Sequence, residues 1–589
     1  MKILLITPPL LQPNTPYAAT PLLSAWLKKC GHETVQADLS IRLLLRLFSR
    51  EGVEKLCEGL EVPEELAISY SERIEEVMAF LQNRSPESAQ KLVRRGYLPE
   101  GAALFRAYEQ EEELGWNFRG LDTEDRARHL ASLFLDDLAE AAGALDPHFG
   151  FSRYAEKLAA SLPHFSPLQQ ALEEPPGLLG SWLDELTQEV FTRVRPDLVA
   201  LTVPFPGTLL GALRIARRIR QLAPQVPIAL GGGYVNTELR ELTDPAIFDF
   251  VDFITLDSGF LPLQHIAENA PPVRTFVREK GRVVWKNSSI PEIPHDQLPP
   301  PDFTGLNLSD YFGMFEMLNP ATRLWSDDRW NKLILAHGCC WARCAFCDTS
   351  IDYICRYDPA TPATICDWIE TTLQKTGFNG FHFVDESLPP ALLDPLCDEI
   401  LRRNLQIEWW GNIRFEKRLS PALIQKMAAA GCIAVTGGLE TACDRTLRLM
   451  QKGIRMQDAE KVLEHFSNAG ILTHAYLMYG FPTQTAAETL QALETIRDFF
   501  DRGILHSAHW HRFALTAHSQ IAHQPQAYNI QCPPPPEHSF AFNEIPFSSS
   551  FDHDLDAMGS ILKTATYNYM LGLALDLPAS HFLAENKMP

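Results

Sequence analysis

Three cysteines form a close cluster just past the middle of the chain. They are Cys340, Cys344 and Cys347, at intervals of four and three residues. Thiolates are the ligands of iron–sulfur clusters, and a loop this short can wrap three of them around one face of a cluster. Three protein ligands leave one iron of a [4Fe-4S] cluster open. The spacing therefore predicts an iron–sulfur site in which one iron can bind a further molecule.

The alternative for this motif is a zinc knuckle. Structural zinc is normally closed by four ligands, which usually come from two separated pairs of residues. Four of the twelve cysteines fall within nine residues and no secretion signal opens the sequence, so we expect reduced thiols and a metal site rather than disulfides. Counting from Cys339 gives intervals of five and three, which do not match the cluster spacing. We interpret Cys339 as a packed thiol.

The elements that must carry this loop alternate between strands and helices. Strand patterns occur near 332–336, 378–384, 406–411, 432–437, 471–478 and 505–515, with helical patterns in the five intervals. Six such units predict a full or partial (β/α)6 barrel of the TIM type over residues 329–530, with chemistry on the loops after the strands. The cysteine loop follows the first of these strands. Residues 531–589 are expected to form a C-terminal extension.

A second alternating pattern precedes the barrel. Strand patterns at 2–7, 33–39, 197–203, 227–230 and 251–256 predict an α/β domain over residues 1–285, with a doubly wound, Rossmann-like parallel sheet. The long stretch between the second and third strands lacks a strand signal and predicts a helical insertion over about 41–190. A proline-rich linker is expected at 286–328. Ligands of such sheets bind beyond the carboxyl ends of the strands.

The cysteine motif resembles the signature of the radical S-adenosylmethionine (SAM) superfamily. Three cysteines stand at the family's spacing, and the aromatic residue just before the last of them is Phe346. The resemblance implies that the amino and carboxylate groups of SAM chelate the open iron, and that one-electron reduction yields a 5′-deoxyadenosyl radical. It also implies a reductant such as flavodoxin or ferredoxin as a partner.

Further residues extend this resemblance over 330–530. Asp385 and Glu386 follow the second barrel strand, where the family places residues that accept from the methionyl ammonium. After the third strand, Asn412 is expected to contact the ribose and Arg414 the SAM carboxylate. The alternative for Arg414 is a surface ion pair.

Two more positions match the family at the ends of later strands. Glu440 resembles an acidic residue near the cofactor, and Gly480 would let the backbone approach the adenine closely. The alternative for Gly480 is a turn that ends the strand. No residue is assigned as a general acid or base.

The N-terminal sheet resembles the cobalamin-binding subclass of radical SAM enzymes. The resemblance is carried by PDLVALTV at 196–203 and IALGGG at 228–233. It implies that Thr202 and the glycines Gly231, Gly232 and Gly233 contact the nucleotide tail of cobalamin. The alternative for the glycines is a tight turn from strand to helix, and the Gly-x-Gly-x-x-Gly of a dinucleotide site is absent after the first strand.

The chain departs from the pattern that supplies an axial histidine to cobalt, because no Asp-x-His-x-x-Gly occurs. Asp146, His148 and Gly150 come close, but their spacing is one residue short and they fall in the helical insertion. Many members of the subclass lack the motif. We therefore expect cobalt without a histidine ligand.

Composition excludes some classes of partner. The chain has 589 residues, with 74 acidic and 52 basic side chains and a net charge of -22, which would repel nucleic acid over most of the surface. No apolar run reaches the roughly 20 residues of a membrane span. We expect a cytoplasmic protein that acts on a small molecule or a peptide.

The resemblance implies a methyltransferase that uses a [4Fe-4S] cluster, SAM and cobalamin to methylate an unactivated carbon. Cyclisation, ring contraction or oxidation without methyl transfer would use the same cofactors. A methylthiotransferase would need more N-terminal cysteines than the two found within the first 300 residues, Cys30 and Cys57. A cobalamin or redox sensor without catalysis is the remaining alternative.

Overall fold

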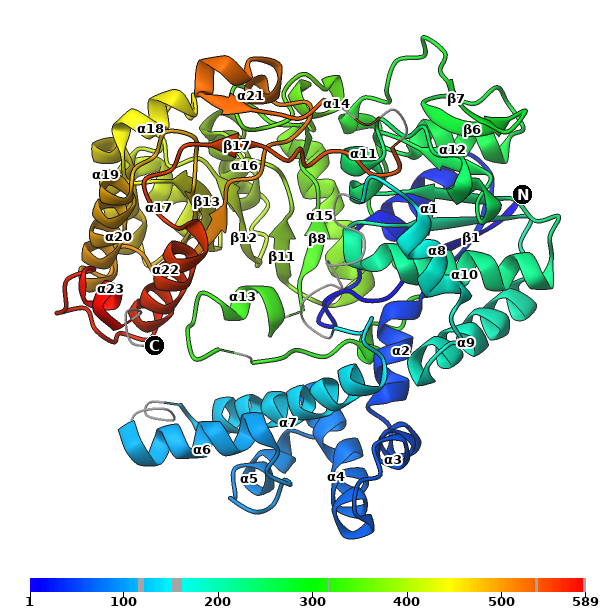
Figure 1. The fold of residues 1–589 in the computed structure, drawn as a ribbon, viewed down its shortest axis with the longest axis horizontal. Coiled ribbons are helices and arrows are strands. Elements are labelled where there is room, and N and C mark those ends of the chain that lie inside the picture. The colour runs from blue at the N-terminus through cyan, green and yellow to red at the C-terminus, as the bar shows by residue number, and fades with distance from the viewer. Residues whose placement is uncertain are drawn as a thin grey trace.

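The computed structural model describes residues 1–114, 121–150, 162–315, 317–327, 329–534, 536 and 539–585. Two large, mainly parallel sheets with helices around them make up most of the chain (Figure 1). This architecture confirms the predicted α/β class, with a Rossmann-like sheet followed by a barrel-like one. Among the described helices, none has both the length and the apolar character needed to cross a bilayer.

The N-terminal sheet has the strand order β2-β1-β3-β4-β5-β6-β7. Its parallel strands are β1 (Lys2–Thr7), β2 (Glu33–Asp38), β3 (Leu198–Thr202), β4 (Ile228–Gly231) and β5 (Phe253–Thr255). An antiparallel hairpin that turns at Lys280-Gly281 completes the sheet with β6 (Thr275–Glu279) and β7 (Arg282–Lys286). Apolar side chains fill both faces of β1, as expected for a parallel sheet covered on both sides.

Helices cover the two faces of this sheet. Ile3 and Leu5 pack toward α1 (Ala19–Lys29) and α12 (Phe260–Ala267), whereas Leu4 and Ile6 pack toward α10 (Leu209–Leu222). A short helix, α11 (Gly233–Glu238), follows β4 directly. The alternation of side chains along one buried strand thus produces the doubly wound arrangement.

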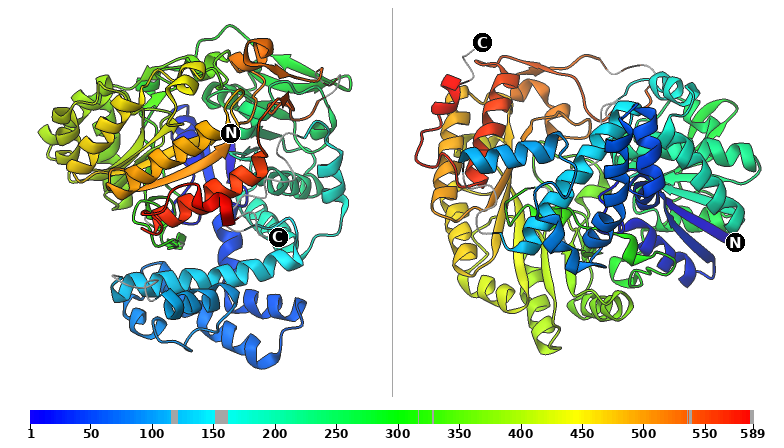
Figure 2. Two further views of the ribbon diagram at one scale, coloured as in Figure 1. Left: turned by 60° about the vertical axis from the view of Figure 1, so that its left-hand side comes forward. Right: turned by 90° about the horizontal axis from the view of Figure 1, so that it is seen from below.

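Helices fill the described part of the chain between β2 and β3. They are α2 (Leu39–Leu47), α3 (Arg50–Gly59), α4 (Glu64–Leu81), α5 (Ala89–Leu92), α6 (Ala102–Leu114), α7 (Thr123–Leu145), α8 (Ser166–Glu173) and α9 (Leu178–Val194). α3 to α7 form a layer that lies below the two sheets in Figure 1 and is seen apart from them in the left view of Figure 2. This layer holds the linker: Ser132 of α7 accepts the Phe315 N–H at 2.7 Å, and Asp125 pairs with Arg323 at 2.9 Å.

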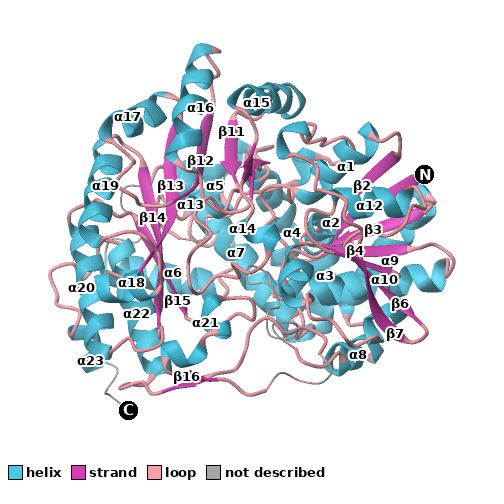
Figure 3. Ribbon diagram, turned by 90° about the horizontal axis from the view of Figure 1, so that it is seen from above, coloured by secondary structure: helices cyan, strands magenta, loops and turns pink. Residues whose placement is uncertain are grey.

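The second sheet has six parallel strands in the order β15-β14-β13-β12-β11-β8, seen edge-on in Figure 3. They are β8 (Asn331–Leu333), β11 (Gly380–Phe383), β12 (Glu408–Ile413), β13 (Cys432–Glu440), β14 (Leu472–Tyr479) and β15 (Ser507–Arg512). Because the order ends at β8 and β15, the sheet is a partial barrel.

Helices cover the outside of this sheet. They are α15 (Pro362–Thr376), α16 (Pro390–Arg402), α17 (Pro421–Ala429), α19 (Met456–Asn468), α20 (Ala486–Asp501) and α22 (Leu555–Met570). Three short helices border the strand ends: α13 (Arg323–Ser326) before β8, α14 (Asp352–Cys355) after it, and α18 (Asp444–Leu449) after β13.

Two glycines in helix-to-strand turns of the barrel differ in how closely other atoms surround them. Substituting each by alanine therefore gives a matched test of the fold. Gly431 and Gly470 both have positive φ, 88° and 74°. A Cβ at Gly431 would overlap the Ile407 carbonyl oxygen, whereas nothing lies within 4 Å of one at Gly470. We expect Gly470→Ala to cost about 1–2 kcal/mol from backbone strain alone. Gly431→Ala should cost roughly 2 kcal/mol more. Thermal unfolding followed by circular dichroism measures the loss of stability in each variant. Equal unfolding midpoints would contradict the close approach of Gly431 to Ile407 at the start of β13.

Candidate cluster and cofactor site

The cysteine loop follows β8 at the mouth of the barrel. Two contacts dock it on the segment after α18: Ala345 donates its backbone N–H to Met450 O at 2.9 Å, and the Trp341 indole donates to Gln451 O at 3.0 Å. The loop is thus held between the first strand and the end of the fourth barrel unit, where the strands end.

The four thiols of this loop lie in two neighbouring pairs, Cys339 with Cys340 and Cys344 with Cys347. Within the described ranges, no three His, Cys, Asp or Glu side chains gather closely enough to hold a single metal ion. Cys339 is half-buried, and its interpretation as a packed thiol stays a prediction.

Two buried cations lie beside these thiols. The Arg414 guanidinium lies 4.2 Å from the centroid of the Trp341 ring and donates to the Lys452 carbonyl oxygen. Arg414 is therefore buried, and the alternative of a surface ion pair is wrong. The neighbouring Cys347 thiol and the charges of Lys452 and Arg414 lower the pKa of Cys344. Because the thiolate is the iron ligand, these charges favour cluster binding.

The two predicted acidic contacts after β11 have different surroundings. The Asp385 carboxylate accepts the backbone N–H groups of Leu335 and Ala336 at 3.0 and 2.7 Å, so it fixes the loop that follows β8. Burial raises the pKa of Asp385 to about 7. Glu386 instead lines a large cavity, where burial raises its pKa. A methionyl ammonium would reach Glu386 more easily than Asp385, and both contacts stay predictions.

The other predicted SAM contacts lie at the same edge of the barrel. Asn412 ends β12 with its amide donating to a main-chain carbonyl at 2.9 Å, and Gly480 follows β14 with φ of 71°. Glu440 ends β13 and pairs with Lys452 at 2.6 Å, and the Lys452 ammonium lies 5.9 Å from the Phe346 ring centroid. The parallel topology brings these residues together around the loop, and their roles toward SAM stay predictions.

A cavity of about 650 Å³ lies between the two sheets. Its walls come from the carboxyl ends of β3, β4 and β5 on one side and of β8 and β11 on the other. Three histidines line it, His295, His337 and His382. His295 and His337 each pair a ring nitrogen with a backbone carbonyl at 2.8 Å. The cavity is therefore enclosed by both predicted domains.

The residues predicted to contact the cobalamin tail all line this cavity: Thr202, Gly231, Gly232 and Gly233. The Thr202 hydroxyl is buried and has no hydrogen-bond partner among the described residues. Gly232 has φ of 120°, and a Cβ there would lie 2.5 Å from the Val203 carbonyl oxygen. The backbone conformation of the turn therefore requires glycine at 232 whether or not a ligand binds. The unpaired Thr202 hydroxyl suits a ligand that accepts or donates a hydrogen bond.

His148 lies outside this cavity. It lines a separate cavity of about 80 Å³ between the helical insertion and α10, together with Asp146 and Arg214. Its ring nitrogen is 4.0 Å from the Glu174 carboxylate. The near-match to an axial-ligand motif therefore lines a different cavity from the residues predicted to contact cobalamin.

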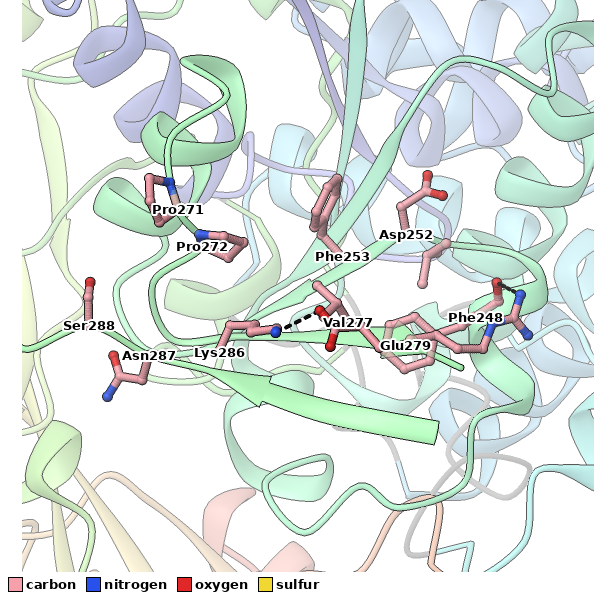
Figure 4. A pocket seen from close by; sticks show the side chains of 12 residues that line it. Phe248, Asp252, Phe253, Pro271, Pro272, Val277, Glu279, Lys286, Asn287 and Ser288 are labelled. Carbon is pink, nitrogen blue, oxygen red and sulfur yellow. Dashed lines mark hydrogen bonds and ion pairs between the residues drawn. The ribbon is translucent and has the colours of Figure 1, made fainter. Parts of the chain in front are cut away.

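Another hollow, of about 730 Å³, opens on the outer edge of the N-terminal sheet. Figure 4 shows it lined by Asp252 and Phe253 at the start of β5 and by the ion pair of Lys286 with Glu279, 2.6 Å apart, on the hairpin. This is the amino end of β5. Since ligands of doubly wound sheets bind at carboxyl ends, the hollow is not the cofactor site.

Residues 334–496 match the sequence profile of the radical SAM superfamily. This part of the chain is a radical SAM domain. Membership implies a [4Fe-4S] cluster and SAM, in agreement with the cysteine loop described above.

The fold is similar to that of two solved enzymes, to one over almost the whole chain and to the other over about two thirds of it. One is TsrM, a radical SAM methyltransferase from Kitasatospora setae with cobalamin and a [4Fe-4S] cluster bound, at 15% identity, 98% coverage of this chain, 90% of that chain and a TM-score of 0.52. The other is the cobalamin-dependent SAM radical enzyme OxsB with aqua-cobalamin bound, at 13% identity, 66% and 60% coverage and a TM-score of 0.50. At these identities the likeness shows the fold.

Two curated proteins are similar in sequence. The anaerobic magnesium-protoporphyrin IX monomethyl ester cyclase of Rubrivivax gelatinosus is 21% identical over 54% of this chain and 57% of its own length. An uncharacterized methyltransferase of Pyrococcus horikoshii is 20% identical over 51% of this chain and 64% of its own length. The chain thus matches less than two thirds of either relative.

On the barrel side of the cavity, sequence reasoning found Glu386 but missed Trp325, Lys332 and His382. A signal for two of them was present. Lys332 and His382 are polar residues within short apolar strands, and alternation in a strand places such residues on the face opposite the helices. The position of Trp325 had no such signal, because it comes from the linker.

The cluster assignment makes a prediction about iron. Anaerobically reconstituted protein should hold about four irons, because one cubane accounts for the three cysteines. Replacing Cys340, Cys344 and Cys347 by Ala should abolish iron binding and 5′-deoxyadenosine formation. Cys339→Ala is the matched control from the same loop and should retain iron. Tightly bound zinc, or loss of iron in Cys339→Ala alone, would contradict the assignment.

Proposed function

We propose that the chain is a cobalamin-dependent radical enzyme that methylates an unactivated carbon. The observation that carries the proposal is the cavity between the sheets, lined by Thr202 and the Gly231–Gly233 turn on one side and by the radical SAM domain on the other. A large cofactor held there would face the loop that carries the cluster.

The cavity residues fit cobalamin chemically. The unpaired Thr202 hydroxyl is buried at the carboxyl edge of β3, where the nucleotide tail of such a cofactor would lie. Small residues and apolar side chains of β1, β3 and β4 form the surrounding wall, which suits a bulky organic group. These features support cobalamin over a small polar ligand.

When bound, SAM and the cluster would supply a 5′-deoxyadenosyl radical, and cobalamin would supply a methyl group. The residues of the chain would hold these groups apart at a fixed distance. Arg414, Lys452 and Glu440 are buried around the cysteine loop. Hydrogen bonds hold these charged side chains in place before any ligand binds. This lowers the free energy needed to reorganise them when charge moves in a reaction step.

A second candidate keeps the cofactors but not the methyl transfer. The sequence similarity to a cyclase from Rubrivivax gelatinosus favours cyclisation or oxidation, while the fold of TsrM and the Pyrococcus horikoshii relative favour methylation. We propose methylation because the full-length similarity in fold is to a methyltransferase.

The tail site can be tested with two buried threonines. Thr202→Val removes an unpaired hydroxyl from the cavity, and Thr372→Val removes another unpaired buried hydroxyl from α15, away from the cavity. Neither change should destabilise the protein without cobalamin, since an unpaired hydroxyl contributes no hydrogen bond. We expect Thr202→Val to weaken hydroxocobalamin binding about two- to tenfold, and Thr372→Val to leave it unchanged. Equal affinities, measured by equilibrium dialysis with corrinoid absorbance, would refute the tail site.

The reaction class can be tested with SAM that carries deuterium in its methyl group. Anaerobic incubation with the holoenzyme, a reductant and candidate substrates should give a product that is heavier by a labelled methyl group in place of hydrogen, together with 5′-deoxyadenosine. A product without the label would favour cyclisation or oxidation. Bound cofactors without any 5′-deoxyadenosine across the substrates would favour the sensor.

A further inference from the structure

Trp325 forms an aromatic surface at the barrel side of the cavity. It lies on α13, lines the cavity, and is half-buried. Its ring centroid lies 5.1 Å from that of Trp410 in an edge arrangement and 4.8 Å from that of His474. The Tyr476 hydroxyl also lies near the Trp325 side chain. Three rings from β12 and β14 therefore hold the indole in one orientation, with part of it open to the cavity.

The segment that carries this indole is anchored on all sides. The Trp325 carbonyl accepts a hydrogen bond from the Asn14 amide at 3.0 Å, and Arg323 pairs with Asp125 of the helical insertion and with Asp327 of the linker. A ring that only closed the bottom of the barrel would need no such support from the other domain. The indole is a preorganised stacking surface.

A cation lies beside this surface. Lys332 on β8 is paired in register with His382 on β11, which is paired with Trp410 on β12. Since neighbouring strands lie about 4.8 Å apart, the backbone of Lys332 is about 10 Å from that of Trp410. His382 stacks on Trp410 between them, with ring centroids 3.5 Å apart. Lys332 and Trp325 therefore flank one stretch of the cavity wall.

The Lys332 ammonium is available for a ligand. No hydrogen bond or ion pair engages it in the described part of the chain, and it lies 5.9 Å from the centroid of the Tyr17 ring. The carboxylate that interacts with it electrostatically is Asp38. Asp38 already accepts hydrogen bonds from two backbone N–H groups and from the Tyr311 hydroxyl. An acidic ligand would supply the partner that Lys332 lacks.

We propose that the substrate is a planar aromatic acid, whose ring stacks on Trp325 and whose acidic group pairs with Lys332. This rests on the proposed function, because it places the substrate in the cavity shared by the cobalamin and SAM sites. The cavity then selects for both features at once. A flat ring alone or an acid alone would satisfy only half of the site.

Binding to the full-length holoenzyme tests this with four probes. Indole-3-acetate and 2-naphthoate carry both features, indole has only the ring, and cyclohexaneacetate has only the acid. Equilibrium dialysis under anaerobic conditions should show at least one planar acid bound about tenfold or more tightly than either half-probe. Equal binding of 2-naphthoate, indole-3-acetate and cyclohexaneacetate, or no binding of either planar acid, would overturn the proposal.

Variants separate the two contacts. Trp325→Leu should weaken the planar acids about five- to tenfold, and Trp325→Phe should retain most of the affinity. Lys332→Met should weaken the acids by a similar factor and leave indole unchanged. Trp285→Leu and Lys286→Met are matched controls on the exposed hairpin and should bind like wild type. Trp325→Leu that binds like Trp285→Leu would refute the stacking surface.

Cofactor loading distinguishes this proposal from the function on which it rests. Each preparation is assayed for iron and for corrinoid absorbance before dialysis. A loaded enzyme that does not discriminate among the probes refutes the substrate class and leaves the proposed function standing. A preparation that takes up no cobalamin refutes both. Loss of cobalamin from Lys332→Met would assign that ammonium to the cofactor and overturn its role toward the substrate.

Discussion

The organisation of this protein depends on one constraint, the alignment of carboxyl ends in a parallel sheet. Every strand of such a sheet ends at the same edge, and the loops that follow it gather there. In this chain two such edges face each other across one cavity. The cysteine loop, the Gly231–Gly233 turn and the strand-end residues of the barrel are all brought to this place by the hydrogen-bond pattern of two sheets.

Buried charge is concentrated at the cluster end of this arrangement. Arg414, Glu440 and Lys452 are each less than a tenth exposed. A buried charge without partners is expensive, so the pair of Lys452 with Glu440 and the contact of Arg414 with the Trp341 ring stabilise the site as well as shape it. The loop that is to hold the cluster is therefore positioned by the protein itself.

The helical insertion and the linker together hold one wall of the cavity in place. α7 binds the linker through Asp125 and Ser132, and the linker in turn places Trp325 against the barrel. An insertion far from β8 in sequence thus supports one wall of the site. This explains how a layer of helices outside both sheets can affect chemistry without contacting a ligand.

The sequence by itself determined the features that depend on neighbouring residues. The spacing of Cys340, Cys344 and Cys347 predicted the cluster loop, because ligands in one short loop need no other part of the chain to come together. Alternation of strands and helices predicted both sheets, because the period of apolar residues is local. The resemblance to cobalamin-binding enzymes predicted the Gly231–Gly233 turn as a contact, and that turn lines one wall of the cavity.

Tertiary structure decided what depends on residues far apart in the chain. Asp385 is occupied by backbone N–H groups of another loop, Arg414 is buried under Trp341, and His148 lies in a different cavity from Thr202. Trp325 and Lys332 meet the N-terminal sheet only because the linker folds back beneath the barrel. No local pattern encodes such contacts, since they arise from the packing of two domains and an insertion against each other.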